Sequence, residues 1–517
     1  MVTGGKPLKS IVAAQAPEKA KERQPLDVQL SGRESKELVL AVSGPIGSGQ
    51  REVVEELRTA LSAFGYSSTT IKLSDFIRKL AAGGKIPGFD AHESFSDVDK
   101  LQTAGNLLRT QHDDAVLAKL AIAHIGAQRM SAQKARGADD GVPPKHAWII
   151  DQLKHPAEAT VLRQIYGNLF YLLGIFSSEA QRLRRLLIDV NATEQNVRLA
   201  MSRDRNENDA HGQKLEKTLQ HADYFIRNSS GRTEHISTQV RRLLGLIHRI
   251  RGLTPSTHES GMYAAYSAAL RSACLSRQVG ASIVDSLGNV ISTGCNDVPK
   301  ANGGLYTNDD RPDDRCVHKG LCFNDLHKAK IQKEVKDRLL ALNVLEPMAS
   351  EIARDLRENT RIKDLIEFSR SVHAEMDAIV TLARNGGPST RGCTLYTTTF
   401  PCHNCARHIL AAGIARVYYF EPYEKSLALD LHGDDIAFDE PTDSSDRRVN
   451  FLHFEGVAPK RFHTFFFAAG SRKGPTGKAI DVQPNESAKI AAQYLDSYLD
   501  YEARVANALT EEGLISV

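Results

Sequence analysis

Short runs of consecutive apolar residues, separated by amphipathic stretches, recur along most of this chain. The first run is Glu37-Leu38-Val39-Leu40-Ala41-Val42, and others lie at 148–151, 170–176 and 224–226. Helical stretches separate these runs, and strands that alternate with helices are typical of a parallel sheet. The pattern therefore predicts a parallel α/β sheet across about residues 37–250.

A second α/β unit is predicted to begin near Met262. Its candidate strands lie at 279–285, 290–295, 393–397 and 417–420. An insertion from about 302 to 360 is charged and is predicted to be mostly helical after Asp325. Pro484-Asn485 is a start signal for one last helix over 485–509, and the polar stretch 128–146 predicts a surface loop.

These patterns divide the chain into four parts. We expect a polar, mobile tail over 1–36, a first α/β domain over 37–255, a second over 256–460, and a helical extension over 461–517. A length of 517 residues is too great for one core, so two packed domains are the expected arrangement.

The overall charge narrows the range of partners. Lys and Arg number 66 and Asp and Glu 63, a net charge of +3, which argues against a protein that mainly grips a nucleic-acid backbone. The chain has no secretion signal and no apolar run of membrane-spanning length, so we expect a cytoplasmic protein without a membrane partner. Seven cysteines in such a chain favour metal binding over disulfides.

The motif with the clearest chemistry is His373-Ala374-Glu375, followed downstream by Pro401-Cys402-His403-Asn404-Cys405. A catalytic zinc ion takes three protein ligands and leaves one position open for water. Cys402 and Cys405 are spaced to face one side of a helical turn, and His373 supplies the third ligand from a second helix. We expect both helices to point their N-termini at the metal, where the helix dipoles favour thiolates. The motif therefore predicts a Zn²⁺ site.

Glu375 is predicted to be a proton carrier and not a fourth ligand. Zinc deaminases as a group combine H-x-E with P-C-x-x-C and use a non-ligating Glu as general acid and base. On this interpretation Glu375 carries protons from the attacking water to N3 of cytosine and to the departing amino group. The alternative is a structural zinc site, but such sites close with four ligands and the chain has no second Cys-x2-Cys pair.

Further segments resemble deoxycytidylate deaminases over about residues 260–440. They are Gln278–Asp285, Ser292–Pro299, Val372–Glu375 and Thr397–Cys402. The resemblance implies hydrolytic deamination of a deoxycytidine nucleotide, and it implies that Asn296 binds the sugar hydroxyl. Asn296 also fits a plain turn residue after a strand.

The resemblance extends upstream. The glycine-rich turn after the first strand, Asp151–Pro156 and His221–Asn228 are similar to a nucleoside-monophosphate-kinase domain. A domain of that kind ahead of a deoxycytidylate deaminase is the plan of the bacterial anti-phage dCTP deaminases. That resemblance implies a P-loop NTPase-like parallel sheet followed by a cytidine-deaminase-like α/β/α domain. It also implies conversion of dCTP and dCMP to deoxyuridine nucleotides during phage infection, a hexamer, and regulation that in some members uses a small RNA.

The glycine-rich turn departs from a complete phosphate-binding loop. Its candidate nucleotide-binding residues are Gly44, Gly47, Ser48, Gly49, Gln50 and Arg51. Backbone amides there can cradle a phosphate, but Gln50-Arg51 stand where Lys and Ser/Thr are needed for phosphoryl transfer. Sensing of a nucleotide effector and a purely structural turn both fit this pattern better than an active kinase does.

A few further residues are weaker candidates for binding sites or for the core. Arg271 and Lys425 are candidates for the substrate phosphates, although lone cations are often simply solvated. Cys316, His318 and Cys322 could hold a second, structural zinc, or the cysteines could be free and buried. Cys274 and Cys393 are expected in the core.

Two other functions remain open. A polynucleotide deaminase acting on RNA or single-stranded DNA would share the zinc motif, but it would need a basic groove with stacking aromatics. A non-catalytic nucleotide-sensing or RNA-binding regulator would use the zinc only structurally.

Overall fold

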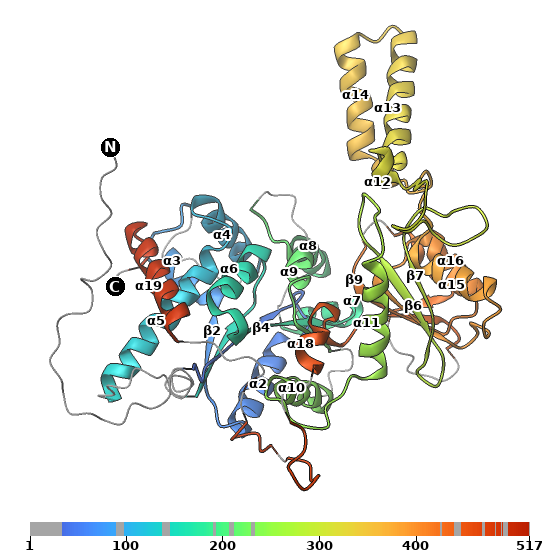
Figure 1. Ribbon diagram of the computed structural model, residues 1–517. Helices are drawn as coiled ribbons and strands as arrows, with labels where there is room; N and C mark the ends of the chain where they lie inside the picture. Colours follow the sequence, from blue (N-terminus) through green and yellow to red (C-terminus); the bar gives the residue numbers. More distant parts are fainter. Residues whose placement is uncertain are drawn as a thin grey trace, which may run out of the picture.

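The structure is a computed structural model, and it holds two six-stranded sheets (Figure 1). It describes residues 34–515 except 89–97, 137–144, 190–192, 206–210, 229–232, 424–425, 439–445, 468–470, 481, 488 and 490–494. Both sheets are mixed and mostly parallel, as the alternation of strands and helices predicts for the first of them. Among the described residues, no helix has the length and apolar character that a bilayer crossing requires.

The first sheet is built mainly from the N-terminal half. Its strands are β1 (Leu38–Ser43), β2 (Ser67–Lys72), β3 (His146–Asp151), β4 (Phe170–Phe176), β5 (Tyr224–Arg227) and β12 (Gly456–Val457). They lie in the order β12-β5-β4-β1-β3-β2, and all are parallel except β12. Every residue of β1 is buried, as expected for a central strand covered on both faces.

Helices cover both faces of this sheet. They are α2 (Gln50–Ala63), α3 (Leu73–Ala82), α4 (Val98–Gln111), α5 (Val116–Arg136), α6 (Pro156–Tyr166), η1 (Gly167–Leu169), α7 (Glu179–Asp189), α8 (Glu194–Arg205), α9 (Leu215–Leu219) and α10 (Thr233–Ile247). The start of α6 shows why a helix forms there: His155 and Glu158 make a capping box and Pro156 occupies the first turn. Two large apolar clusters pack on the two faces.

The second sheet carries the motif residues. Its strands are β6 (Gly280–Val284), β7 (Val290–Cys295), β8 (Thr394–Thr399), β9 (Arg416–Glu421), β10 (Ile436–Ala437) and β11 (Val449–His453), in the order β10-β11-β9-β8-β6-β7. Its helices and short turns are α11 (Thr257–Ala269), α12 (Cys316–Lys319), α13 (Phe323–Ala341), α14 (Glu346–Asn359), η2 (Arg361–Asp364), α15 (Ala374–Arg384), α16 (His403–Ala411) and α17 (Ala428–His432). The helices α13 and α14 form the predicted helical insertion, and they project as a hairpin from the rest of the molecule (Figure 1).

The chain returns to the first sheet at its end. After β11, strand β12 pairs with β5, and η3 (Pro459–Arg461) and α18 (Phe462–Phe466) follow. The last helix, α19 (Leu495–Glu511), packs along α5 beside the first sheet (Figure 1). Therefore the predicted second domain and the predicted extension each contribute an element to the N-terminal half.

Three details differ from the sequence prediction. Residues up to Arg136 continue α5, so the loop predicted from 128 is wrong at its start. Pro484 and Asn485 lie in a turn, where the hydroxyl of Ser487 donates to the Pro484 carbonyl, and α19 begins at Leu495. Strand β2 was not predicted, because its sequence is polar and only Ile71 in it is buried.

Candidate functional site

Three potential metal ligands converge at the ends of two helices. His373 is the N-cap of α15, Cys402 is the N-cap of α16, and Cys405 lies in the first turn of α16. Nδ1 of His373 lies 3.3 Å from Sγ of Cys402 and 3.4 Å from Sγ of Cys405. The predicted placement of both helix N-termini at the ligand set is confirmed.

Electrostatics favour a thiolate in this group. The hydrogen bond from Cys405, together with His373, lowers the pKa of Cys402 to about 4. The hydrogen bond to Cys402 in turn raises the pKa of His373. Among the described residues, these three form the one set of three or more His, Cys, Asp or Glu donors within 4.8 Å of one another. Two sulfurs and an imidazole nitrogen at these distances are compatible with zinc.

Glu375 lies beside the three donors. Its Oε2 is 3.4 Å from Sγ of Cys405, and the hydroxyl of Thr397 donates to its Oε1 at 3.3 Å. Burial, and the charge of Cys402 after it, raise the pKa of this carboxyl. A buried carboxyl with a raised pKa beside a metal site has the properties of a general acid and base.

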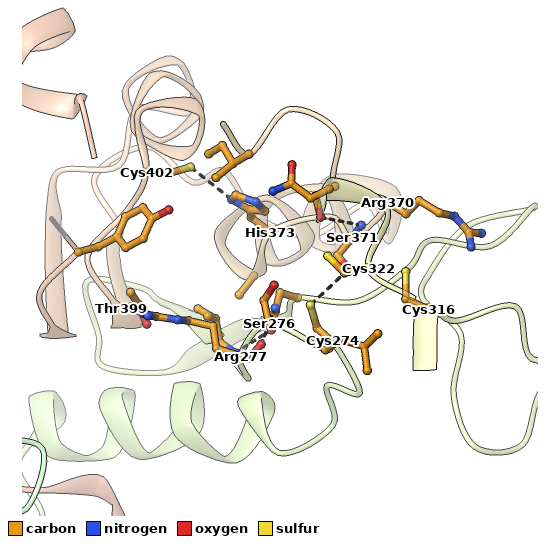
Figure 2. Close-up of a pocket in the computed structure, with 18 of the residues that line it drawn as sticks. Cys274, Ser276, Arg277, Cys316, Cys322, Arg370, Ser371, His373, Thr399 and Cys402 are labelled. Atoms are coloured by element: carbon orange, nitrogen blue, oxygen red, sulfur yellow. Dashed lines mark hydrogen bonds between the residues drawn. The ribbon is translucent and has the colours of Figure 1, made fainter. Parts of the chain in front are cut away.

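The site opens into a cavity of about 180 Å³. His373, Glu375 and Cys402 form part of its wall, and Figure 2 shows the pocket with the residues around it. Other parts of the wall come from the segment before β6, the start of α13, the segment before α15, and residues after β7, β8 and β9. A concave site with a few convergent polar groups is the expected form of a small-molecule pocket.

Asn296 also lines this pocket. Its carboxamide is held on both sides by backbone: Oδ1 accepts from the N–H of Val279 at 2.7 Å, and Nδ2 donates to the carbonyl of Arg277 at 2.9 Å. The side chain thereby ties the end of β7 to the segment that enters β6. It is buried and rigidly positioned at the pocket wall.

The cations at the pocket are not those chosen from the sequence. Arg277 and Arg370 line it, whereas Arg271 does not, and Lys425 lies outside the described residues. In Figure 2 the side chain of Arg277 extends toward Thr399, and Arg370 lies on the other side, beyond Ser371.

Arg277 could have been found from the sequence. It lies directly before Gln278–Asp285, one of the segments that resemble deoxycytidylate deaminases. Its guanidinium lies 5.8 Å from the ring centre of Tyr423, another pocket residue.

Three cysteines line the same pocket: Cys274, Cys316 and Cys322. Cys274 is half-buried and accepts from the hydroxyl of Ser371 at 3.7 Å, so its prediction as a core residue is wrong. Cys316, His318 and Cys322 do not form a compact donor set within the described part of the chain. His318 is instead exposed and pairs with Asp313 at 3.0 Å. Cys393 is in the core, as predicted.

The glycine-rich turn lies far along the chain from this pocket, between β1 and α2. Gly49 has a φ of 81° and is the N-cap of α2, a conformation that favours glycine. The N–H of Ser48 donates to the Pro45 carbonyl at 3.1 Å, and the side-chain amide of Gln50 donates to the same carbonyl at 2.7 Å. Arg51 is exposed at the start of the helix. None of these residues lines the pocket beside His373.

The part of the chain that holds this site is similar to known proteins. Residues 255–421 match the family described as cytidine and deoxycytidylate deaminase zinc-binding region. The deoxycytidylate deaminase of Enterobacteria phage T4 is 31% identical over 162 residues, which cover 31% of this chain and 76% of the phage protein. The deoxycytidylate deaminase of Enterobacteria phage T2 is 30% identical over 162 residues, 31% of this chain and 78% of that protein.

One solved structure is also similar to part of the chain. The dCMP deaminase of cyanophage S-TIM5 is 19% identical, with a TM-score of 0.22, and covers 39% of this chain and 99% of its own. His373, Glu375, Cys402 and Cys405 all fall within the range that the family match covers.

Proposed function

This chain belongs to the cytidine and deoxycytidylate deaminase family, and we propose that its C-terminal domain is a zinc-dependent enzyme that deaminates dCTP and dCMP. The reaction replaces the amino group at C4 of cytosine by a carbonyl oxygen from water and releases ammonia. The observation that carries the proposal is the placement of Glu375 within 3.4 Å of Cys405, at the wall of the pocket that also holds His373 and Cys402.

The donor atoms fit a zinc ion. His373, Cys402 and Cys405 offer three ligands, the number that catalytic zinc sites use, and the low pKa of Cys402 supplies a thiolate near neutral pH. Zinc bound there would activate a water molecule as a nucleophile. The dipoles of α15 and α16 favour the negative charge of the sulfurs that hold it.

Glu375 performs the proton transfers. Its carboxylate accepts one proton from the attacking water and gives it to N3 of cytosine. After the oxygen has added to C4, the carboxylate takes the second proton from that oxygen and passes it to the amino group as the C4–N bond breaks. The hydroxyl of Thr397 orients one carboxylate oxygen while the other faces the donor set. Burial keeps bulk water from competing for these protons.

The remaining pocket residues bind the nucleotide. We assign the substrate phosphates first to Arg277, which reaches into the pocket, with Arg271 and Lys425 as the alternatives. Asn296 would contact the sugar hydroxyl while its backbone bonds fix its position. An arginine is suited to a phosphate because its planar fork donates two parallel hydrogen bonds.

We assign the N-terminal half a nucleotide effector. The support is a glycine-rich turn that follows a central parallel strand and begins a helix, an arrangement that can cradle phosphate. Gln50 and Arg51 replace the residues needed for phosphoryl transfer, so the turn is assigned to sensing and not to kinase activity. From the family resemblance we further propose depletion of dCTP during phage infection, a hexameric assembly and inhibition by a small RNA.

A turnover panel tests the proposal. Full-length, zinc-loaded protein is incubated with dCTP, dCMP, CTP, cytidine and labelled single strands of DNA and RNA, and products are separated by liquid chromatography. The expected products are dUTP and dUMP. Failure with every deoxycytidine nucleotide would overturn the substrate assignment, and conversion of the strands alone would favour a polynucleotide deaminase. Repeating the panel with each dNTP added tests the effector.

A further inference from the structure

The glycine-rich turn already holds an anion, and the chain itself supplies it. Asp204, near the end of α8, accepts a hydrogen bond from the N–H of Ile46 at 2.7 Å through its Oδ2. Its Oδ1 accepts from Nζ of Lys154 at 2.5 Å. Only 1% of Asp204 is exposed, so this carboxylate is placed inside the protein and not at its surface.

The position of Asp204 is one that suits a phosphate. Backbone N–H groups of a glycine-rich turn at a helix N-terminus attract anions. Three cations surround the turn. Lys154 also donates to the carbonyl of Gly44 at 3.0 Å, and Arg185 donates to the carbonyl of Gly47 at 3.1 Å. Arg182 is close enough that the charge of Asp204 opposes the burial that lowers its pKa.

Buried polar atoms beside the turn are also left without partners. Among the described residues, the hydroxyl of Ser48, Nε of Arg182 and Oδ1 of Asn228 have no hydrogen-bond partner. Ser48 is completely buried. Unsatisfied buried groups cost stability, and one explanation for them is a ligand that the fold is built to receive.

The helix that carries Asp204 is held to α4 and α9 by polar contacts, and its apolar packing is small. The helices α7 and α8 share a small apolar cluster of their own, formed by Leu186, Val197 and Met201, with Ile46 of the turn packed against it. A Cβ at Gly47 would lie 2.8 Å from the carbonyl oxygen of Arg182, so α7 rests directly on the turn. A unit with so small a core belongs to the less stable parts of a fold, which are the parts that open.

We propose that α7 and α8 form a lid over the glycine-rich turn and that Asp204 occupies the place of a ligand phosphate. A phosphate-bearing ligand binds the turn by displacing Asp204 from Ile46 and Lys154, which releases the lid. The ligand class is a nucleoside polyphosphate or free polyphosphate. The inference extends the proposed effector role of the turn and is independent of the deaminase reaction.

Binding of inorganic tripolyphosphate to the full-length protein tests this lid. Asp204→Asn keeps the size of the side chain and removes the competing charge, so it should bind tripolyphosphate at least about tenfold more tightly than wild type, by isothermal titration calorimetry. Glu194→Gln is the matched control, because Glu194 lies on the same helix but is exposed and pairs with Arg198. Its affinity should equal that of wild type.

The outcomes separate the two parts of the inference. Equal affinity of wild type and Asp204→Asn would overturn the competing role of Asp204 and leave the phosphate site. No binding by either protein would overturn the phosphate site as well. A parallel titration with dNTPs distinguishes a nucleotide from free polyphosphate.

A second measurement needs no variant. Hydrogen–deuterium exchange of wild type with saturating tripolyphosphate should show faster exchange in α8, over 194–205, while the turn over 44–49 stays protected. Unchanged exchange in α8 at saturation would contradict the opening of the lid, whether or not Asp204→Asn folds.

Discussion

The carboxylate of Glu375 lies 3.4 Å from the thiol of Cys405, although the two residues are 30 positions apart in the chain. This contact places the proposed proton carrier beside the three proposed zinc ligands, and Glu375 itself lies outside the compact set of three donors. The division between groups that hold the metal and a group that moves protons is the basis for the first two predictions.

Replacing Glu375 by Gln should remove turnover and leave the metal in place. General acid–base catalysis contributes about 10²- to 10⁴-fold, so ammonia release should fall by at least about a hundredfold. Zinc content, measured by elemental analysis, should stay equal to that of wild type because the three ligands are intact. Unimpaired ammonia release would exclude Glu375 as the proton carrier, and a biological effect that survives the loss of turnover would favour a regulator.

Replacing Cys402 by Ser should remove the metal. A catalytic site with two remaining ligands binds zinc far more weakly, so the purified variant should contain less than about a tenth of the zinc of wild type. Cys393→Ala is the matched control, because Cys393 is buried in the core of the same domain and is not in the ligand set. Equal zinc in Cys402→Ser and wild type would refute the ligand assignment.

Replacing Arg277 by Gln should weaken binding of the phosphate. Loss of a charge-assisted hydrogen bond corresponds to about a 10- to 100-fold rise in KM for dCMP and dCTP. The KM for deoxycytidine, which has no phosphate, should not change. Arg271→Gln serves as the comparison, because Arg271 does not line the pocket. A larger effect at Arg271 than at Arg277 would return the phosphate site to the residue chosen from sequence.

Acid should destabilise the protein through His248. Burial, followed by the charge of Lys145, lowers the pKa of His248 from 6.5 to about 4. The neutral ring lies between the hydroxyl of Tyr66, 3.2 Å from Nε2, and the carbonyl of Ser487, 3.4 Å from Nδ1. The unfolded state therefore binds the proton more strongly, and this stability is complete above pH 6.5 and is lost as the pH falls toward 4.

The expected loss is about 3 kcal/mol of the free energy of unfolding across that window. Urea titrations at intervals between pH 7 and 4 measure it. In His248→Gln the same interval should show a shallower fall, since the titrating ring is gone. If the free energy of unfolding falls equally with pH in wild type and His248→Gln, other groups account for the acid sensitivity.

A buried arginine helps to attach the last helix. Arg129 of α5 donates to Glu37 at 3.1 Å and to Glu502 of α19 at 3.0 Å, and all three side chains are buried. Arg129→Met would leave two buried carboxylates without their counter-charge and should cost about 3–5 kcal/mol of unfolding free energy. Arg58→Met, at an exposed pair with Glu55, should cost under about 1 kcal/mol. Similar losses in both variants would show that burial does not decide this interaction.

The sequence alone was sufficient to predict the features of this protein that depend on residues close together in the chain. The spacing of Cys402 and Cys405 places both on one helical turn, and the run from Leu38 to Val42 is apolar enough to be a central strand wherever it pairs. These features do not depend on how the domains pack, because helical periodicity and a run of consecutive apolar residues are properties of neighbouring positions in the sequence.

Only the tertiary structure decided which distant residues meet. It brought Arg277 to the pocket and left Arg271 outside it, and it seated Asp204 on the turn at Ile46, 158 positions away. The polar strand β2 and the return of β12 to the first sheet likewise have no signature in their own residues. Such contacts depend on how all the intervening helices and strands pack together, and a short stretch of sequence does not determine that packing.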